Sequence, residues 1–171
     1  MKGKWAAGIE PRNFAWVIKD QLAVCERPGG YGANHRRVRR QEEIIWLRQQ
    51  GFDIVFSLIP GSPNLNNYRE LGLPFAHRPW PQREQLQSFL ETIYGEMDTL
   101  LNREKKVVIH AEELSERVCG IVAGYLLYAR FVSTGPQALA MVERIFQRHL
   151  GPFGRELVEI SLAIKQPRVA D

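Results

Sequence analysis

The chain has 171 residues, of which 44% are hydrophobic, and a formal net charge of +4. This length and composition allow one full core, so we expect a single domain over residues 1–171, with its core between about residues 13 and 165. No stretch approaches the roughly eighteen apolar residues of a membrane span, and residues 1–7 lack the apolar core of a signal peptide, so we expect a cytoplasmic protein. The two cysteines, Cys25 and Cys119, give no disulfide framework.

Hydrophobic periodicity predicts strands and helices that alternate along the later part of the chain. Short apolar runs predict strands at residues 14–18, 21–25, 53–58, 73–77 and 106–110. Apolar residues at helical spacing predict helices at residues 38–50, 83–103, 117–131, 135–149 and 154–165. Residues 60–67, which are rich in proline and asparagine, are predicted to form a loop. The alternation indicates an α/β fold with a mostly parallel central sheet flanked by helices on both faces.

The positive charge is concentrated in the first 60 residues, which contain ten Lys or Arg and six Asp or Glu. At its centre lie His35 and the arginines Arg36, Arg37, Arg39 and Arg40. This cluster is the candidate surface for a partner, such as an acidic or phosphorylated protein. The simpler interpretation is a solvated loop and helix start. Nucleic acid is disfavoured, because no aromatic or glycine-rich interleaving accompanies the arginines.

Residues 107–120 carry the most informative pattern in the sequence. Val107–Ile109 predict a buried strand and Val118–Phe131 an apolar helix, and a tight strand-to-helix loop is a common anion site. His110 and Arg117, seven residues apart, resemble the His-Cys-x-x-Gly-x-x-Arg signature of the protein tyrosine and dual-specificity phosphatases. Other segments resemble the same family: Asn13–Ile18, Arg27–Gly30, Glu42–Leu47, Gly51–Leu58 and Leu71–Phe75. The alternative interpretation is an ordinary strand-loop-helix of an α/β protein, with His110 a core histidine and Arg117 a solvated charge at a helix start.

The signature departs from the family pattern at the positions that carry its chemistry. Where the resemblance implies the nucleophilic cysteine, this chain has Ala111, whose methyl group cannot attack phosphorus. Leu114 replaces the loop glycine and Val118 replaces the hydroxyl that follows the arginine. Three carboxylates, those of Glu112, Glu113 and Glu116, are added to a segment whose implied ligand is a dianion. We therefore expect phosphate binding to be weak or absent, with Arg117 and Ser115 as its remaining candidates.

The general acid that the resemblance implies is missing as well. The corresponding segment, His77–Arg83, contains no carboxylate. Glu84 follows it, but the apolar pattern of residues 86–93 places Glu84 in the first turn of a helix, where an acidic side chain is favoured by the helix dipole. Nucleophile and acid are thus lost from two separate segments.

Three hypotheses follow for the function. The first is a noncatalytic, pseudophosphatase-like domain that binds another protein as a regulator or scaffold, without cofactor or metal. The second is a module that recognises a phosphorylated partner through Arg117. The third is an active phosphatase in which Ala111 is a laboratory substitution. Leu114 and Val118 argue against the third, because trapping a substrate requires neither change.

Overall fold

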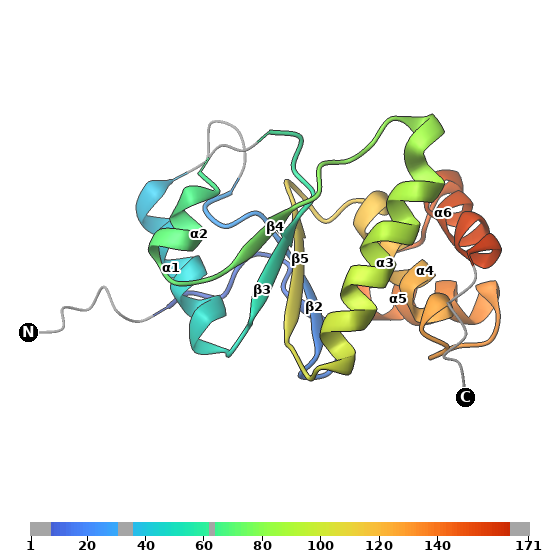
Figure 1. Ribbon diagram of the computed structural model, residues 1–171, viewed down its shortest axis with the longest axis horizontal. Helices are drawn as coiled ribbons and strands as arrows, with labels where there is room; N and C mark the ends of the chain where they lie inside the picture. Colours follow the sequence, from blue (N-terminus) through green and yellow to red (C-terminus); the bar gives the residue numbers. More distant parts are fainter. Residues whose placement is uncertain (1–7, 31–35, 62–63, 165–171) are drawn as a thin grey trace, which may run out of the picture. The chain divides into compact units, whose positions relative to one another are not determined.

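The computed structural model describes residues 8–30, 36–61 and 64–164 (Figure 1). Its strands are β1 (Ala15–Ile18), β2 (Leu22–Glu26), β3 (Ile54–Ser57), β4 (Phe75–His77) and β5 (Val107–Ala111). Its helices are α1 (Arg37–Gln49), α2 (Asn66–Glu70), α3 (Leu86–Asn102), α4 (Glu116–Tyr128), α5 (Gly135–Phe146) and α6 (Pro152–Ala163), with a 3-10 turn, η3 (Arg83–Gln85), before α3. The strands and the longer helices lie where the periodicity predicts them, to within a few residues.

The chain forms two compact units. The first comprises residues 1–80 and 100–114 and contains the sheet, and the second comprises residues 81–99 and 115–171 and contains α4, α5, α6 and most of α3. The boundary crosses the segment after β5, between Leu114 and Ser115. A single domain over residues 1–171 stays a prediction.

The sheet has the strand order β1-β2-β5-β3-β4. Only β1 pairs antiparallel, to β2, whereas β2, β5, β3 and β4 pair in parallel, which confirms the predicted mostly parallel sheet. The central strand is β5, and its His110 lies in register with Cys25 of β2 and Ser57 of β3. Because parallel strands end at the same edge of a sheet, the residues that follow β2, β3 and β5 gather at one edge, where α/β proteins place their sites.

One face of the sheet is covered by α1 and α2. Ile44 and Leu47 of α1 and Tyr68 of α2 belong to one buried cluster with Val55 of β3 and Val108 of β5. Period-two alternation explains the pairing, because every second side chain of a strand points to the same face. The alternate strand residues Leu22, Val24, Phe56, Val107 and Ile109 are buried too.

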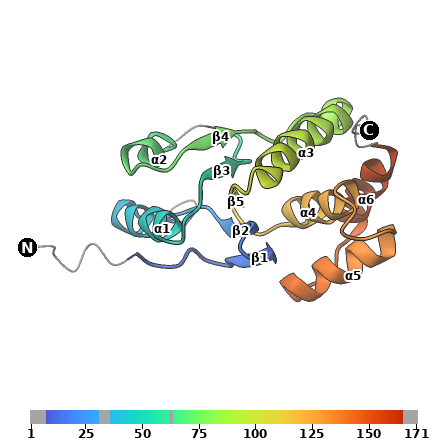
Figure 2. The same ribbon diagram turned by 60° about the horizontal axis from the view of Figure 1, so that its bottom comes forward.

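The second unit is held together by close packing of α4 on α6 (Figure 2). A Cβ added at Gly120 of α4 would lie 2.6 Å from Leu157 Cδ1 and 3.2 Å from the Gly154 Cα of α6. At Gly124, a Cβ would overlap Ser161 Oγ and Tyr94 OH, which hydrogen-bond to each other at 3.0 Å. The two glycines therefore allow an approach that larger residues would prevent.

Local sequence signals explain where the later helices begin. Thr134 and Gln137 form a capping box at the start of α5, and Pro136 occupies its first turn. Helix α6 starts at Pro152, two residues earlier than predicted, because proline is well suited to the first helical position. None of the helices in the described ranges combines the length and hydrophobicity of a membrane span.

The short helix α2 was not predicted. Asn66–Glu70 was assigned in part to the loop at residues 60–67, because asparagine favours turns and five residues are too few for a clear period. Tertiary packing explains the difference, since Tyr68 is buried against the sheet.

Candidate functional site

His110 fixes the end of β5 in the interior of the first unit. It is buried, and its Nδ1 lies 3.2 Å from the hydroxyl of Tyr68, which is buried as well. Burial, with smaller contributions from the charges of Arg27 and His77, lowers the pKa of His110 from 6.5 to about 3. The imidazole is therefore neutral at physiological pH, and its contact with Tyr68 belongs to the interior of the first unit.

Ala111 ends β5 at the position that the resemblance assigns to the nucleophile. Its carbonyl oxygen accepts a 2.7 Å hydrogen bond from the backbone N–H of Arg27, in the turn after β2. Neither cysteine replaces it. Cys119 is fully buried in α4, where burial raises its thiol pKa to about 11, and Cys25 is buried in β2 with a raised pKa. Both thiols are thus uncharged and poor nucleophiles.

Glu112 forms an ion pair with Arg27. Its Oε1 accepts a 3.0 Å hydrogen bond from Nη1 of Arg27, whose side chain is 11% exposed against 42% for Glu112. The pair joins the turn after β2 to the segment after β5, across 85 positions of sequence. Glu113, the next residue, is exposed.

Glu116 caps a helix, contrary to the expectation that it adds charge to an anion loop. It lies in the first turn of α4, and its Oε1 accepts a 2.8 Å hydrogen bond from the backbone N–H of Gly154. Gly154 is the third residue of α6, whose N-cap, Gly151, has no side chain to serve that N–H. Glu116 supplies the missing cap from the neighbouring helix.

Ser115 and Arg117 lie at the start of α4, close to the predicted helix start at residue 117. Ser115 is the N-cap residue, but its side chain caps no backbone N–H. Arg117 is exposed in the first turn, whereas Val118 is fully buried. Val118 therefore fills core space at the position where the resemblance implies a hydroxyl.

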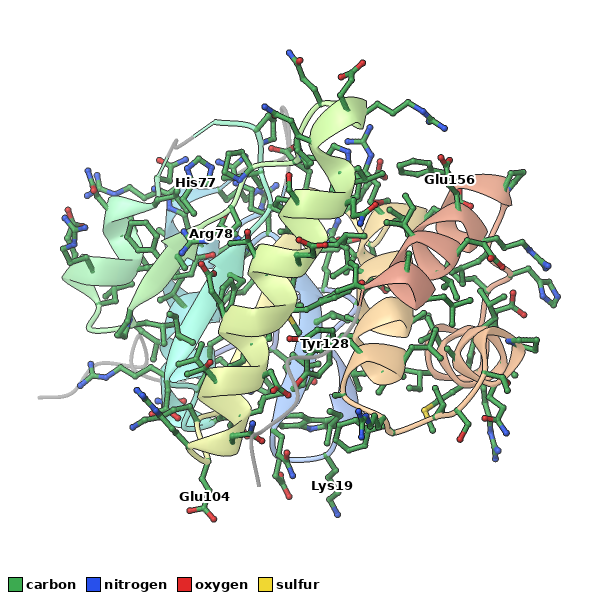
Figure 3. The ribbon with its side chains drawn as sticks, turned by 45° about the vertical axis from the view of Figure 1, so that its right-hand side comes forward. Lys19, His77, Arg78, Glu104, Tyr128 and Glu156 are labelled. Atoms are coloured by element: carbon green, nitrogen blue, oxygen red, sulfur yellow. The ribbon has the colours of Figure 1, made fainter. Side chains whose placement is uncertain are left out.

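The segment expected to carry the acid contains arginines and histidine instead (Figure 3). His77 Nε2 lies 2.8 Å from the carbonyl oxygen of Ile59, and Arg78 donates to the carbonyl oxygen of His77 at 2.9 Å. Glu84 lies exposed in η3, just before α3, which agrees with its predicted place at a helix start. In the described part of the chain, no cluster of three or more His, Cys, Asp or Glu residues could hold a metal ion.

The predicted arginine surface is smaller than the sequence suggests. Arg36 and Arg37 are exposed at the start of α1. Arg39 is half-buried and paired with Glu43 at 2.6 Å. Arg40 is 7% exposed, so its assignment to the surface was wrong: it lies one residue beyond Arg39 on the helix and turns inward. His35 lies outside the described residues.

Sequence reasoning missed Arg27 and Glu43 as residues that build the site. Glu43 is 1% exposed and accepts hydrogen bonds from the Gly29 N–H and from Arg39 Nε, which fixes the turn that carries Arg27. The positive φ angles of Gly29 and Gly30 allow this turn. The Arg27–Gly30 sequence indicated the turn, but no local pattern pointed to its partners.

Solved structures with the same fold are protein tyrosine and dual-specificity phosphatases, which confirms the predicted fold. The kinase associated phosphatase, with its catalytic-site cysteine substituted by serine, is 21% identical with a TM-score of 0.72, over 86% of this chain and 92% of that chain. Tk-PTP in its active form is 20% identical with a TM-score of 0.67, over 88% and 97%. A mouse putative dual specificity phosphatase complexed with zinc tungstate is 17% identical with a TM-score of 0.66, over 90% and 89%. No protein-family model matches the sequence, and no curated protein matches it.

Proposed function

We propose that this protein is a catalytically inactive, phosphatase-like domain that acts in the cytoplasm by binding another protein. The observation that carries the proposal is Ala111 at the end of β5. This strand lies between β2 and β3 in the centre of the sheet. An alanine offers no nucleophile, and the two cysteines are buried with raised pKa values. Covalent phosphoryl transfer then has no first step.

The carboxylates of the region support the same proposal. The general acid that the family resemblance implies is a carboxyl group within hydrogen-bond reach of the leaving oxygen. Glu112 is paired with Arg27 and Glu116 caps α6, so these side chains serve the structure. His77–Arg83 contains no carboxylate.

The exposed arginines Arg36 and Arg37 are the proposed contact for the partner, an acidic or phosphorylated protein. They begin α1 beside the turn of Gly29, whose carbonyl oxygen accepts the Arg36 N–H at 3.0 Å. Two guanidinium groups on an ordered helix start can pair with carboxylates or phosphates.

Two measurements test the proposal. The purified protein should hydrolyse an aryl phosphate no faster than its Arg117→Ala variant, and a rate that depends on Arg117 would contradict the loss of catalysis. The second measurement concerns binding. The double variant Arg36→Glu, Arg37→Glu should bind an acidic partner protein more weakly than the unmodified protein does. The matched control is Arg103→Glu with Lys105→Glu, which makes the same charge change at two exposed residues outside this surface. Equal loss in both variants would show that net charge alone matters.

The alternative function is recognition of a phosphorylated partner through Arg117 and Ser115. It is favoured by the exposed guanidinium of Arg117 in the first turn of α4, and by the Ser115 hydroxyl, which caps no N–H. The tungstate complex of the mouse structure shows that an oxyanion binds that relative. A phosphopeptide titration monitored by the Arg117 side-chain NMR signals tests it, and the absence of a saturable shift at millimolar concentration would remove it.

The remaining alternative is an active phosphatase in which Ala111 replaces a natural cysteine. Sequencing the natural gene tests it, and an alanine codon at position 111 would end it.

A further inference from the structure

The Arg27–Glu112 pair joins a largely buried guanidinium to a carboxylate that borders solvent. The backbone N–H of Arg27 is bound to the Ala111 carbonyl oxygen at 2.7 Å, and its own carbonyl oxygen accepts the Gly30 N–H at 3.1 Å. The Arg27 side chain is 11% exposed. The hydrogen bonds fix the main chain of Arg27 and burial restricts its side chain, so the guanidinium loses less conformational entropy when it binds an anion.

Glu112 is the carboxylate that the described structure places on this guanidinium. Two nearby carboxylates of the same unit are committed elsewhere: Glu26 accepts from Asn13 at 2.7 Å, and Glu43 accepts from the Gly29 N–H and Arg39. Glu112 itself is 42% exposed, so its place on Arg27 borders solvent. Removing it leaves a largely buried cation without a countercharge, at a position that a small ion can reach.

The charge of Arg27 acts on the groups around it. The charge of Arg27 contributes, after burial, to the lowered pKa of His110 and to the lowered pKa of Arg40. The Arg27 guanidinium thus adds a positive contribution to the local potential, and a positive contribution favours a bound oxyanion.

We propose that Arg27 is an oxyanion-binding site that the chain fills with its own Glu112 carboxylate. The unmodified protein is therefore closed to free phosphate at this position, and the site opens when Glu112 is neutralised or drawn away. This inference goes beyond the proposed function and does not depend on it, because it concerns Arg27 and neither Ala111 nor Arg117.

The test is the variant Glu112→Gln, titrated with inorganic phosphate and followed by ³¹P NMR and calorimetry. The amide keeps the size of the side chain and removes its charge. We expect saturable phosphate binding about tenfold or more tighter than in the unmodified protein, as for a charge-assisted bond to arginine. The matched control is Glu113→Gln, which makes the same charge change at the next residue and should leave phosphate binding unchanged.

Two double variants identify the cation. Glu112→Gln with Arg27→Gln should lose the gained binding, and Glu112→Gln with Arg117→Gln should keep it. The proposal is overturned if Glu112→Gln gains nothing, if Glu113→Gln gains as much, if the unmodified protein binds equally well, or if the gain depends on Arg117.

Should Glu112→Gln fail to fold, Glu112→Ala replaces it. Acetate, which restores the missing carboxylate, should then raise its melting temperature more than that of Glu113→Ala, and no difference would overturn the proposal.

Discussion

The end of β5 and the segment that follows it, residues 112–117, differ in what holds their side chains. At the end of β5, His110 is buried and bound to Tyr68, and this interior contact supports the sheet. In the following segment, Glu112 and Glu116 are held by single polar contacts at partly exposed positions. The first region depends on packing and the second on charges that serve local structure.

The comparison explains how a phosphatase-like fold can keep its framework while residues 112–117 depart from the family signature. The buried framework contributes most of the stability, because burial and packing outweigh surface charge contacts. A charged residue within 112–117 therefore needs only a polar partner that lies close to it in the fold. Arg27 and the N-terminus of α6 provide such partners for Glu112 and Glu116.

The largest effect should come from the buried framework of the second unit. We expect Gly124→Ala to lower the free energy of unfolding by about 3 kcal/mol, because the new methyl group separates Tyr94 from Ser161 in a close-packed core. Urea denaturation followed by circular dichroism measures the change. Gly95→Ala on α3 is the control: its Cβ meets nothing within 4 Å, so the variant should be as stable as the parent or more so. Equal loss in both variants would show that α4 and α6 do not pack as described.

A second effect should appear in the pH dependence of stability. The folded-state pKa of His110 is about 3, below the ordinary value of 6.5, so the unfolded chain binds the additional proton. The contribution of neutral His110 to the free energy of unfolding is fully present above pH 6.5. It is lost progressively as the pH falls toward 3. The free energy of unfolding should fall by about 1.4 kcal/mol for each pH unit below 6.5. The loss therefore amounts to about 2 kcal/mol by about pH 5.

His110→Gln tests this origin. Glutamine cannot titrate, so the variant should be less stable at neutral pH but should lack this part of the slope. Denaturant midpoints at several pH values between 7 and 4 measure both quantities. An unchanged slope in the variant would assign the acid sensitivity to other groups.

The sequence predicts the first of the two regions better than the second. The strand at 106–110 and the helix at 117–131 follow from runs of apolar residues, which are local signals. The partner of Glu112 lies 85 positions away and that of Glu116 38 positions away. Contacts at such separations depend on the folded topology, so the sequence alone suggested repulsion between charges that the structure shows to be satisfied.

The burial of Arg40 and the helix α2 were missed for the same reason. A run of arginines predicts a solvated face, and only packing of α1 decides which of them turns inward. The family resemblance, in contrast, depended on His110 and Arg117 at fixed spacing, which requires no knowledge of tertiary contacts. It therefore identified the fold correctly.

A smaller effect on the free energy of unfolding is expected from changes within residues 112–117. Glu116→Ala should lower the free energy of unfolding by about 1 kcal/mol, because the Gly154 N–H and the start of α6 lose their cap. Glu113→Ala, at an exposed neighbour, should change it by less than about 0.5 kcal/mol. Thermal unfolding of the two variants side by side measures the difference. If Glu113→Ala cost as much, the helix cap would not be the cause.

The smallest effect should be the return of activity in Ala111→Cys. The new thiol restores a nucleophile, but Leu114 and Val118 still occupy the positions of the loop glycine and the hydroxyl, and His77–Arg83 still contains no acid. Because a thiol without these supports keeps a pKa near 8.5, little thiolate forms at neutral pH. We expect aryl phosphate hydrolysis at the rate of the matched variant Ala111→Ser, and alkylation of the thiol by iodoacetamide with an ordinary pH profile. Turnover well above that of Ala111→Ser would mean that the segment after β5 still binds an anion in a catalytic geometry. The contacts of Glu112 and Glu116 would then not have removed the function of this segment.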